Sequence, residues 1–242
     1  MKIKVGTVWK NGKLRYKRPN GGWLQPLRQY MKVGGVWSRF YNDPNAVVET
    51  FETGNLFTEG TLSVIRQVAS AYKGGYGLYA AGNHNTLRAK LSSTVLQDLT
   101  GTYRYETMVR PVLTDWGQSL VGLAFCGATA DTQDVYTAFI DTRNSGANPT
   151  VPSSEMGLQL RYGTGWNEIM NATLQEVNFG QWYRLVVTHN QTTGLIEVVL
   201  EDEAGAVLNK ITKVDQRLKG GRFGVFTVGA GDFDLVSREK VS

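Results

Sequence analysis

The stretch Gly180–Lys210, GQWYRLVVTHNQTTGLIEVVLEDEAGAVLNK, predicts three antiparallel strands joined by two tight turns. From Tyr183 to Thr188 one face of the first strand is uniformly apolar and the other is mixed, as in a half-buried β-strand. Asn190–Gly194 and Asp202–Gly205 supply the turns, and each contains a glycine that can adopt a positive φ. Such a meander cannot stand alone, so we expect a second layer to cover its apolar face.

Composition indicates an all-β chain that can bury a substantial core. The chain has 242 residues, of which 41% are apolar, and turn signals recur at short intervals while helical periodicity is scarce. It contains no apolar run of the roughly 20 residues that span a bilayer, and its start lacks a signal peptide. We therefore expect neither membrane insertion nor secretion. The single cysteine, Cys126, excludes an intrachain disulfide and is expected to be a small buried residue.

Charge is distributed unevenly along the chain. The net charge is +5, but residues 1–45 hold ten Lys and Arg against one acid, Asp43, whereas residues 46–242 hold 16 basic and 20 acidic residues. The basic character therefore belongs to the first segment alone, and the high pI does not indicate nucleic-acid binding by the whole protein. The turn cluster Asn42–Asn45 marks the change, so we predict two domains, 1–45 and 46–242.

The first segment is predicted to be a small module of β-hairpins. Lys4–Lys10, KVGTVWK, is nearly repeated by Lys32–Ser38, KVGGVWS, and Asn11–Gly12 between two alternating stretches predicts a two-residue hairpin turn. The segment has three Trp and few aliphatic residues, so it cannot bury enough apolar area to be stable alone. We expect it to dock on another surface.

The motif Val33–Trp37 resembles basic Lys-x-Gly-Gly-Val-Trp elements of structural and tail proteins of tailed bacteriophages. This resemblance implies a virion-anchoring role for the aromatic and cationic residues Trp9, Lys10, Arg15, Trp23 and Trp37. Cations interleaved with aromatics could also bind single-stranded nucleic acid. Within a virion we favour docking on an acidic protein surface, which weakens as salt rises.

From residue 47 onward the order of features resembles the concanavalin A-like lectin and glucanase superfamily, including laminin G-like domains. The segments that carry the resemblance are Phe51–Gly54 as a first strand, Tyr72–Tyr79, Tyr103–Val112, Ser119–Cys126, Tyr136–Asp141, Gly157–Tyr162, Trp182–Leu185, Gly220–Val225 and Phe233–Asp234. The resemblance implies an antiparallel jelly-roll or concanavalin A-like β-sandwich, preceded by the small N-terminal hairpin module.

Catalytic signatures are missing from the sequence. The glucanases of this superfamily use a pair of carboxylates held close together, which requires a Glu-x-Asp-x-x-Glu type of run. No such run occurs, Glu201–Glu203 falls at a turn and Glu155 stands alone in sequence. His84 and His189 are far apart, so neither a triad nor a zinc site is visible. We predict no enzymatic activity and no cofactor.

Carbohydrate binding needs exposed aromatic platforms and planar hydrogen-bonding groups. The candidates are Trp116, Tyr136, Gln159, Arg161 and Trp166, and the two Trp residues could instead fold back as lids over the sandwich ends. Related sandwiches also imply a possible calcium site at Glu52 and Asp234, with Asp131, Asp134 or Asp232 as outlying ligands. Without a dense acidic loop, however, ordinary strand-end acids are the simpler interpretation, and we predict no metal.

The two resemblances imply a non-enzymatic structural protein of a phage virion, as a minor tail or tail-tip or fibre component. Its sandwich would contact host-surface glycans, and its basic module would bind other virion proteins. We expect a homo-oligomer, made in the host cytoplasm without a signal peptide and located in the virion. The alternatives are a purely structural capsid or tail decoration protein and a glycoside hydrolase.

Overall fold

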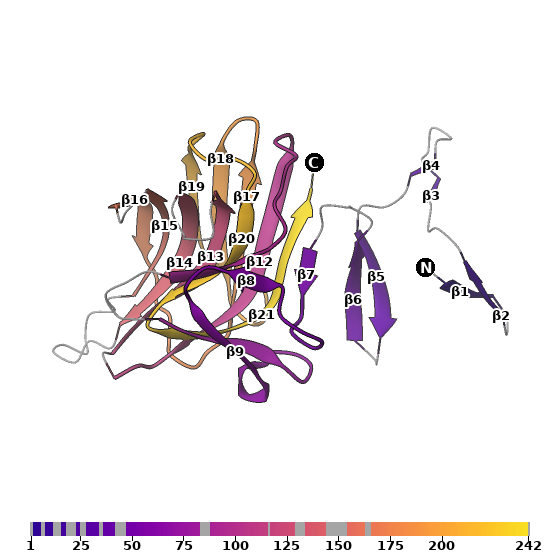
Figure 1. The fold of residues 1–242 in the computed structure, drawn as a ribbon, viewed down its shortest axis with the longest axis horizontal. Helices are drawn as coiled ribbons and strands as arrows, with labels where there is room; N and C mark the ends of the chain where they lie inside the picture. The colour runs from indigo at the N-terminus through magenta and orange to yellow at the C-terminus, as the bar shows by residue number, and fades with distance from the viewer. Residues whose placement is uncertain are drawn as a thin grey trace. The chain divides into compact units, whose positions relative to one another are not determined.

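The computed structural model describes residues 2–5, 8–11, 16–17, 23–24, 28–33, 36–41, 47–82, 88–115, 117–128, 134–143, 154–162 and 166–241, the strands before residue 47 by their backbone alone. The chain divides into two compact units, Met1–Ala46 and Val47–Ser242. Antiparallel sheets dominate both units (Figure 1). The predicted all-β architecture, a jelly-roll sandwich preceded by β-hairpins, is confirmed.

The first unit contains three two-stranded sheets. Their strands are β1 (Lys2–Val5) with β2 (Val8–Asn11), β3 (Tyr16–Lys17) with β4 (Trp23–Leu24), and β5 (Arg28–Val33) with β6 (Val36–Tyr41). In the first and third sheets, Val5 pairs with Val8 and Val33 pairs with Val36, so two residues join each pair of strands. The repeated Val-Gly-x-Val sequence is thus a hairpin signal.

The predicted hairpin turn at Asn11–Gly12 lies partly outside the described residues, which include Asn11 but not Gly12. Asn11 is the last residue of β2 and pairs with Lys2 at the far end of the same hairpin. Short alternating segments can pair with the strand before or after them, because alternation sets the face of each side chain but not the partner strand.

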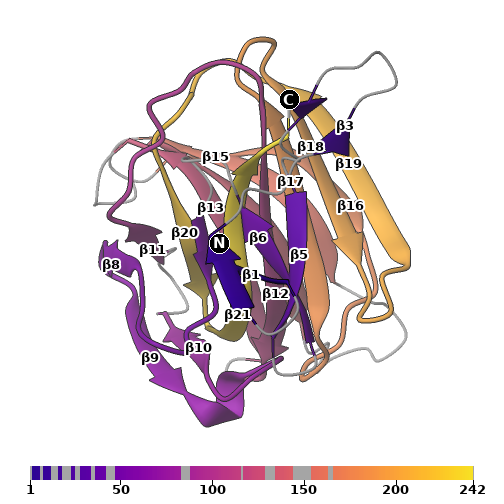
Figure 2. The ribbon, with the colours of Figure 1, turned by 90° about the vertical axis from the view of Figure 1, so that its right-hand side faces the viewer.

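The second unit is a sandwich of an eight-stranded and a seven-stranded sheet. The eight-stranded sheet has the order β19-β18-β17-β12-β21-β10-β9, with β7 also paired to β21 (Figure 2). Its strands are β7 (Val47–Glu49), β9 (Ser63–Gln67), β10 (Gly77–Ala81), β12 (Thr102–Val112), β17 (Tyr183–Asn190), β18 (Leu195–Glu201), β19 (Val207–Val214) and β21 (Ala230–Lys240).

The seven-stranded sheet has the order β16-β15-β14-β13-β20-β11-β8. Its strands are β8 (Phe57–Glu59), β11 (Arg88–Ser92), β13 (Gln118–Gly127), β14 (Val135–Arg143), β15 (Glu155–Tyr162), β16 (Trp166–Leu174) and β20 (Arg222–Val228). The described residues include one short 3-10 helix, η1 (Val68–Ser70), and none of them forms a helix with the length and hydropathy of a membrane span.

The predicted meander forms three consecutive strands at one edge of the eight-stranded sheet. β17 pairs with β18 and β18 pairs with β19, all antiparallel. The apolar face identified from alternation is buried in the core, as shown by the fully buried residues Leu185, Val187, Ile196, Val198 and Leu200. The seven-stranded sheet is the second layer that this face requires.

The predicted first strand at Phe51–Gly54 is displaced in the structure. The strand is β7, Val47–Glu49, and the chain bends from Phe51, which has a positive φ of 59°. The Glu49 carboxylate accepts hydrogen bonds from the backbone N–H groups of Phe51 and Leu56, at 2.6 and 2.7 Å, and so holds the bend. The similarly predicted Tyr72–Tyr79 strand begins only at Gly77.

Candidate functional site

Strand β15 carries two of the predicted binding residues on the same face. Met156, Leu158 and Leu160 alternate into the core, so Gln159 and Arg161 lie on the face turned away from the other sheet, here called the outer face. Gln159 is buried and Arg161 is half-buried, and this burial lowers the pKa of the Arg161 guanidinium.

Strand β14 places its own side chains beside these residues. In the antiparallel register Thr137 lies opposite Gln159, and Val135 lies opposite Arg161. Thr137 is fully buried, and its Oγ1 has no hydrogen-bond partner within the part of the chain that the structure describes. An unsatisfied buried hydroxyl costs roughly 1–3 kcal/mol, so Thr137 is a costly position in the sheet and not a surface that a ligand reaches.

An apolar floor lies next to these polar groups. A cluster separate from the main core consists of Ala89, Leu91, Ala124, Val135, Phe139 and Phe226. Phe139 lies across Gly157 so closely that a Cβ on the glycine would be 2.2 Å from the Phe139 Cζ. The outer face therefore combines a buried apolar cluster with a planar amide and a guanidinium, of which the half-buried Arg161 guanidinium can reach a ligand.

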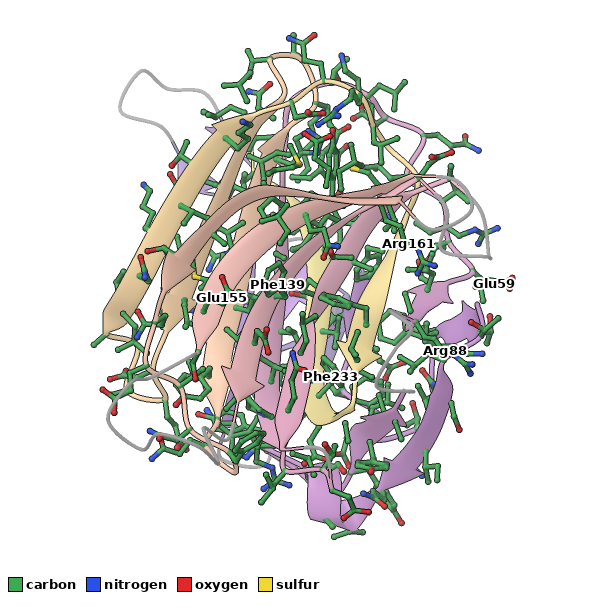
Figure 3. All side chains as sticks on the ribbon, turned by 90° about the vertical axis from the view of Figure 1, so that its left-hand side faces the viewer. Glu59, Arg88, Phe139, Glu155, Arg161 and Phe233 are labelled. Carbon is green, nitrogen blue, oxygen red and sulfur yellow. The ribbon has the colours of Figure 1, made fainter. Side chains whose placement is uncertain are left out.

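Two carboxylates meet at the other end of this face. Asp141 on β14 lies opposite Glu155 on β15, although Glu155 stands alone in sequence. The Gln118 amide donates to both Asp141 oxygens, at 3.0 and 3.2 Å. Figure 3 shows Glu155 and Arg161 toward opposite ends of β15, with Phe139 between them. Only strand pairing could reveal this pair of acids, because 13 residues separate them in sequence.

Tyr136 lies on the opposite face of β14 and is not part of this surface. It is fully buried, with its ring centroid 5.4 Å from that of Phe125 and 5.8 Å from that of His189. Its hydroxyl donates to Asp215 and accepts the Leu218 N–H. A sugar cannot stack on a core ring, so we remove Tyr136 from the candidate site.

Several predicted residues fall wholly or partly outside the described residues. Trp116 and Arg15 lie outside them altogether. Trp166 begins β16, and the proposed anchoring residues Trp9, Lys10, Trp23 and Trp37 lie on β2, β4 and β6, in each case described by the backbone alone.

The acids considered for calcium act instead as anchors for a loop. Glu52 Oε1 accepts the N–H groups of Gly75 and Tyr76, and Asp234 Oδ2 accepts those of Tyr72 and Lys73. Among the described residues, no group of three or more His, Cys, Asp or Glu side chains could hold a metal ion. Asp131 lies outside these residues.

Cys126 and His189 form a buried polar contact that sequence spacing did not reveal. The Cys126 Sγ lies 3.3 Å from the His189 Nδ1, and both residues are inaccessible to solvent. Burial raises the pKa of the Cys126 thiol to about 12 and lowers the pKa of His189 to about 4. A protonated thiol sealed in the core cannot act as a nucleophile on a substrate.

The fold of the second unit resembles that of known carbohydrate-binding proteins. The carbohydrate-binding module CBM66 from Bacillus subtilis aligns over 82% of this chain and 98% of its own, with a TM-score of 0.54 and 14% identity. It is a lectin-like sandwich. The lectin from Bauhinia forficata in complex with GalNAc aligns over 82% and 99%, with a TM-score of 0.53 and 11% identity.

A phage protein has a similar fold. The CBM2 module of the evolved Dit from Lactobacillus casei BL23 phage J-1 aligns over 83% of this chain and 93% of its own, with a TM-score of 0.51 and 8% identity. No family model matches the chain, and no curated protein matches it in sequence. At these identities the similarities establish the fold alone.

Proposed function

We propose that the second unit is a non-catalytic glycan-binding domain whose ligand contacts the outer face of the seven-stranded sheet. The observation that carries this proposal is the half-buried Arg161 guanidinium beside Gln159 on that face, in a fold similar to those of a carbohydrate-binding module and a lectin. A guanidinium holds several N–H donors in a fixed fork, so Arg161 can donate to two hydroxyls of one sugar ring.

The rest of the face supplies the other needs of sugar recognition. Gln159 lies beside Arg161 on the same face and supplies a planar amide that both donates and accepts hydrogen bonds. Trp116 and Trp166 remain our proposed aromatic platforms for a sugar ring.

For the whole chain we propose a structural role in a phage virion, as a minor tail or tail-tip component that presents this domain to host-surface glycans. The basic first segment would dock on another virion protein through Trp9, Lys10, Arg15, Trp23 and Trp37. The shared fold of the phage J-1 Dit module supports this setting. A purely structural decoration role would need the same anchor but no glycan.

The direct test is binding of the full chain to an array of bacterial surface polysaccharides. We expect binding that Arg161→Ala weakens, because this change removes a group of hydrogen-bond donors from the outer face. Thr212→Ala, on an exposed position of β19, is the matched control and should bind normally. Absence of binding to every polysaccharide, or equal binding by all variants, would refute the glycan site.

The Asp141–Glu155 pair is the observation that favours the alternative, a glycoside hydrolase. Asp141 and Glu155 are directly opposite on paired antiparallel strands, where Cβ atoms are about 4.5–5.5 Å apart, and retaining glycosidases hold two carboxyl groups about 5 Å apart. Incubating each polysaccharide bound on the array with wild type and with Asp141→Asn and Glu155→Gln distinguishes the two functions. Reducing ends released by wild type alone would establish hydrolysis and overturn the non-catalytic proposal.

A further inference from the structure

A strap, residues 68–76, crosses the outer face of the eight-stranded sheet between β9 and β10. Its path is tight, because a Cβ on Gly77 would lie 1.8 Å from the Ser70 carbonyl oxygen. Two side chains of the sheet hold this part of the strap: Asp232 accepts a hydrogen bond from the Ser70 hydroxyl, and Arg110 donates to the Ala69 carbonyl at 2.7 Å.

Two carboxylates fix the rest of the strap. Asp234 Oδ2 accepts the N–H groups of Tyr72 and Lys73 at 3.0 and 2.9 Å, and Glu52 Oε1 accepts those of Gly75 and Tyr76 at 2.8 and 3.1 Å. Asp234 is fully buried, and burying a carboxylate is costly unless it is hydrogen-bonded. Four backbone N–H groups of the strap therefore donate to these two carboxylates, and the hydrogen bonds hold the strap in one conformation.

The strap brings Tyr72 against Trp182, which lies just before β17. The ring centroids are 5.4 Å apart with planes tilted by 58°, and both side chains are only half-buried. The Arg110 guanidinium carbon lies 4.9 Å from the Trp182 ring centroid. Two large aromatics therefore remain partly open to solvent on a rigid sheet, in fixed relative orientation.

Most charges around this pair are held in ion pairs. Arg110 forms an ion pair with Asp232 at 2.8 Å, and Arg184 bridges Glu106 and Glu201, each at 2.7 Å. Lys73 is an exposed cation beside them, with its Nζ 5.2 Å from the Tyr72 ring centroid. An uncharged polyhydroxylated ligand could share the remaining donors and acceptors of all these groups without breaking an ion pair. Aromatic surface beside balanced polar groups suits the C–H face and hydroxyls of a neutral sugar.

We propose that Tyr72 and Trp182 form a second sugar-contact site, specific for neutral glycans, on the outer face of the eight-stranded sheet. This site lies on the opposite side of the sandwich from Thr137 and Gln159 and shares no residue with that face. Its anchored strap pre-organises the aromatic pair, so binding would require little ordering of the protein. Two faces that each contact glycan would let the domain engage two chains of a surface polysaccharide.

The test follows amide and indole N–H resonances of the full chain while methyl glycosides of glucose, galactose, mannose and N-acetylglucosamine are added separately. We expect at least one of them to shift the Trp182 indole resonance, assigned by its loss in Trp182→Phe, and the Tyr72 amide resonance. In Trp182→Ala and Tyr72→Ala, affinity measured from the remaining strap amides should fall about tenfold or more.

Two matched variants locate the effect. Ile65→Ala changes an exposed residue on β9 of the same sheet, and Ile169→Ala changes an exposed residue on β16 of the other sheet, so both should retain the titration. Loss in Arg161→Ala but not in Trp182→Ala would place binding on the seven-stranded sheet and overturn this proposal only. No shift near Trp182 with any of the four glycosides would also overturn it.

The strap has its own variant, Glu52→Gln, which keeps a carbonyl acceptor but removes the charge. If the strap pre-organises the pair, this change should weaken sugar binding while leaving the cooperative unfolding transition in place. The Gly75 and Tyr76 amide resonances of this variant should move, which would show that the strap has changed. If the affinity for sugar is nevertheless unchanged, the strap does not contribute to binding.

Discussion

The Nδ1 of His189 lies 3.3 Å from the Sγ of Cys126 in the sealed interior of the sandwich. Burial is the main reason that the pKa of His189 falls from 6.5 to about 4, and the charge of Lys219 lowers it further. The folded state therefore binds fewer protons than the unfolded state between these values. The contribution of neutral His189 to the free energy of unfolding is fully present above about pH 6.5. It is lost as the pH falls toward 4, and the total loss is on the order of 3 kcal/mol.

We predict that His189→Asn removes this dependence. The free energy of unfolding of wild type relative to the variant should decline between about pH 7 and about pH 4, measured by urea denaturation. Thr212→Ala, at an exposed position of β19 that does not titrate, is the control and should follow the wild-type profile. A difference between wild type and His189→Asn that stays constant with pH would contradict the assignment.

Asp234 opposes this effect. Burial raises its pKa to about 6, against the backbone hydrogen bonds that lower it. The folded state thus binds more protons than the unfolded state between about pH 6 and 4, and this contribution to stability grows as the pH falls. In Asp234→Asn the stabilisation that Asp234 provides at low pH is absent, while the destabilisation from His189 remains. We therefore predict a steeper loss of stability on acidification than in wild type. A parallel or shallower profile would show that Asp234 titrates normally.

Cys126 should be chemically inert in the folded protein. Its thiol is buried and its pKa is about 12, so the thiolate that reacts with Ellman's reagent is scarce and shielded. We predict no reaction under native conditions and one equivalent of thiol in guanidinium chloride. Rapid stoichiometric reaction of the native protein would mean that the core opens at this point.

Gly157 is required by the ring of Phe139. In Gly157→Ala the new methyl group would start 2.2 Å from the Phe139 Cζ, and overpacking of this kind costs about 1–3 kcal/mol. Urea denaturation should show this loss, and the double variant Gly157→Ala/Phe139→Leu should recover part of it. If the double variant is no better than the sum of the two single changes, the contact is not the cause.

The basic segment and the sandwich should be separable. The two units are distinct by their internal contacts, with the division after Ala46. We predict that a chain lacking residues 1–45 keeps its cooperative thermal transition but no longer enters virus particles. Loss of the transition would show that the sandwich depends on the first unit, and normal incorporation would refute the anchoring role.

Alternation within single strands was enough to predict the meander at β17–β19 and the all-β class, whereas the sandwich was predicted from the family resemblance. The first two depend on which side of one strand a residue faces, and that follows from the period of two in the backbone. The predicted first strand at Phe51–Gly54 was wrong because a side-chain contact overrides the local preference for a strand. Glu49 binds the N–H of Phe51, and the strand ends at Glu49.

What the sequence alone determined, then, is the class, the layers and the faces of the strands. The tertiary structure decided which side chains meet, as in Thr137 with Gln159, Asp141 with Glu155 and Tyr72 with Trp182. The first two pairs join residues on neighbouring strands, and the third joins the strap, residues 68–76, to the residue just before β17. Their meeting is set by strand order and register, which arise from the packing of the whole core and leave no local pattern in the chain.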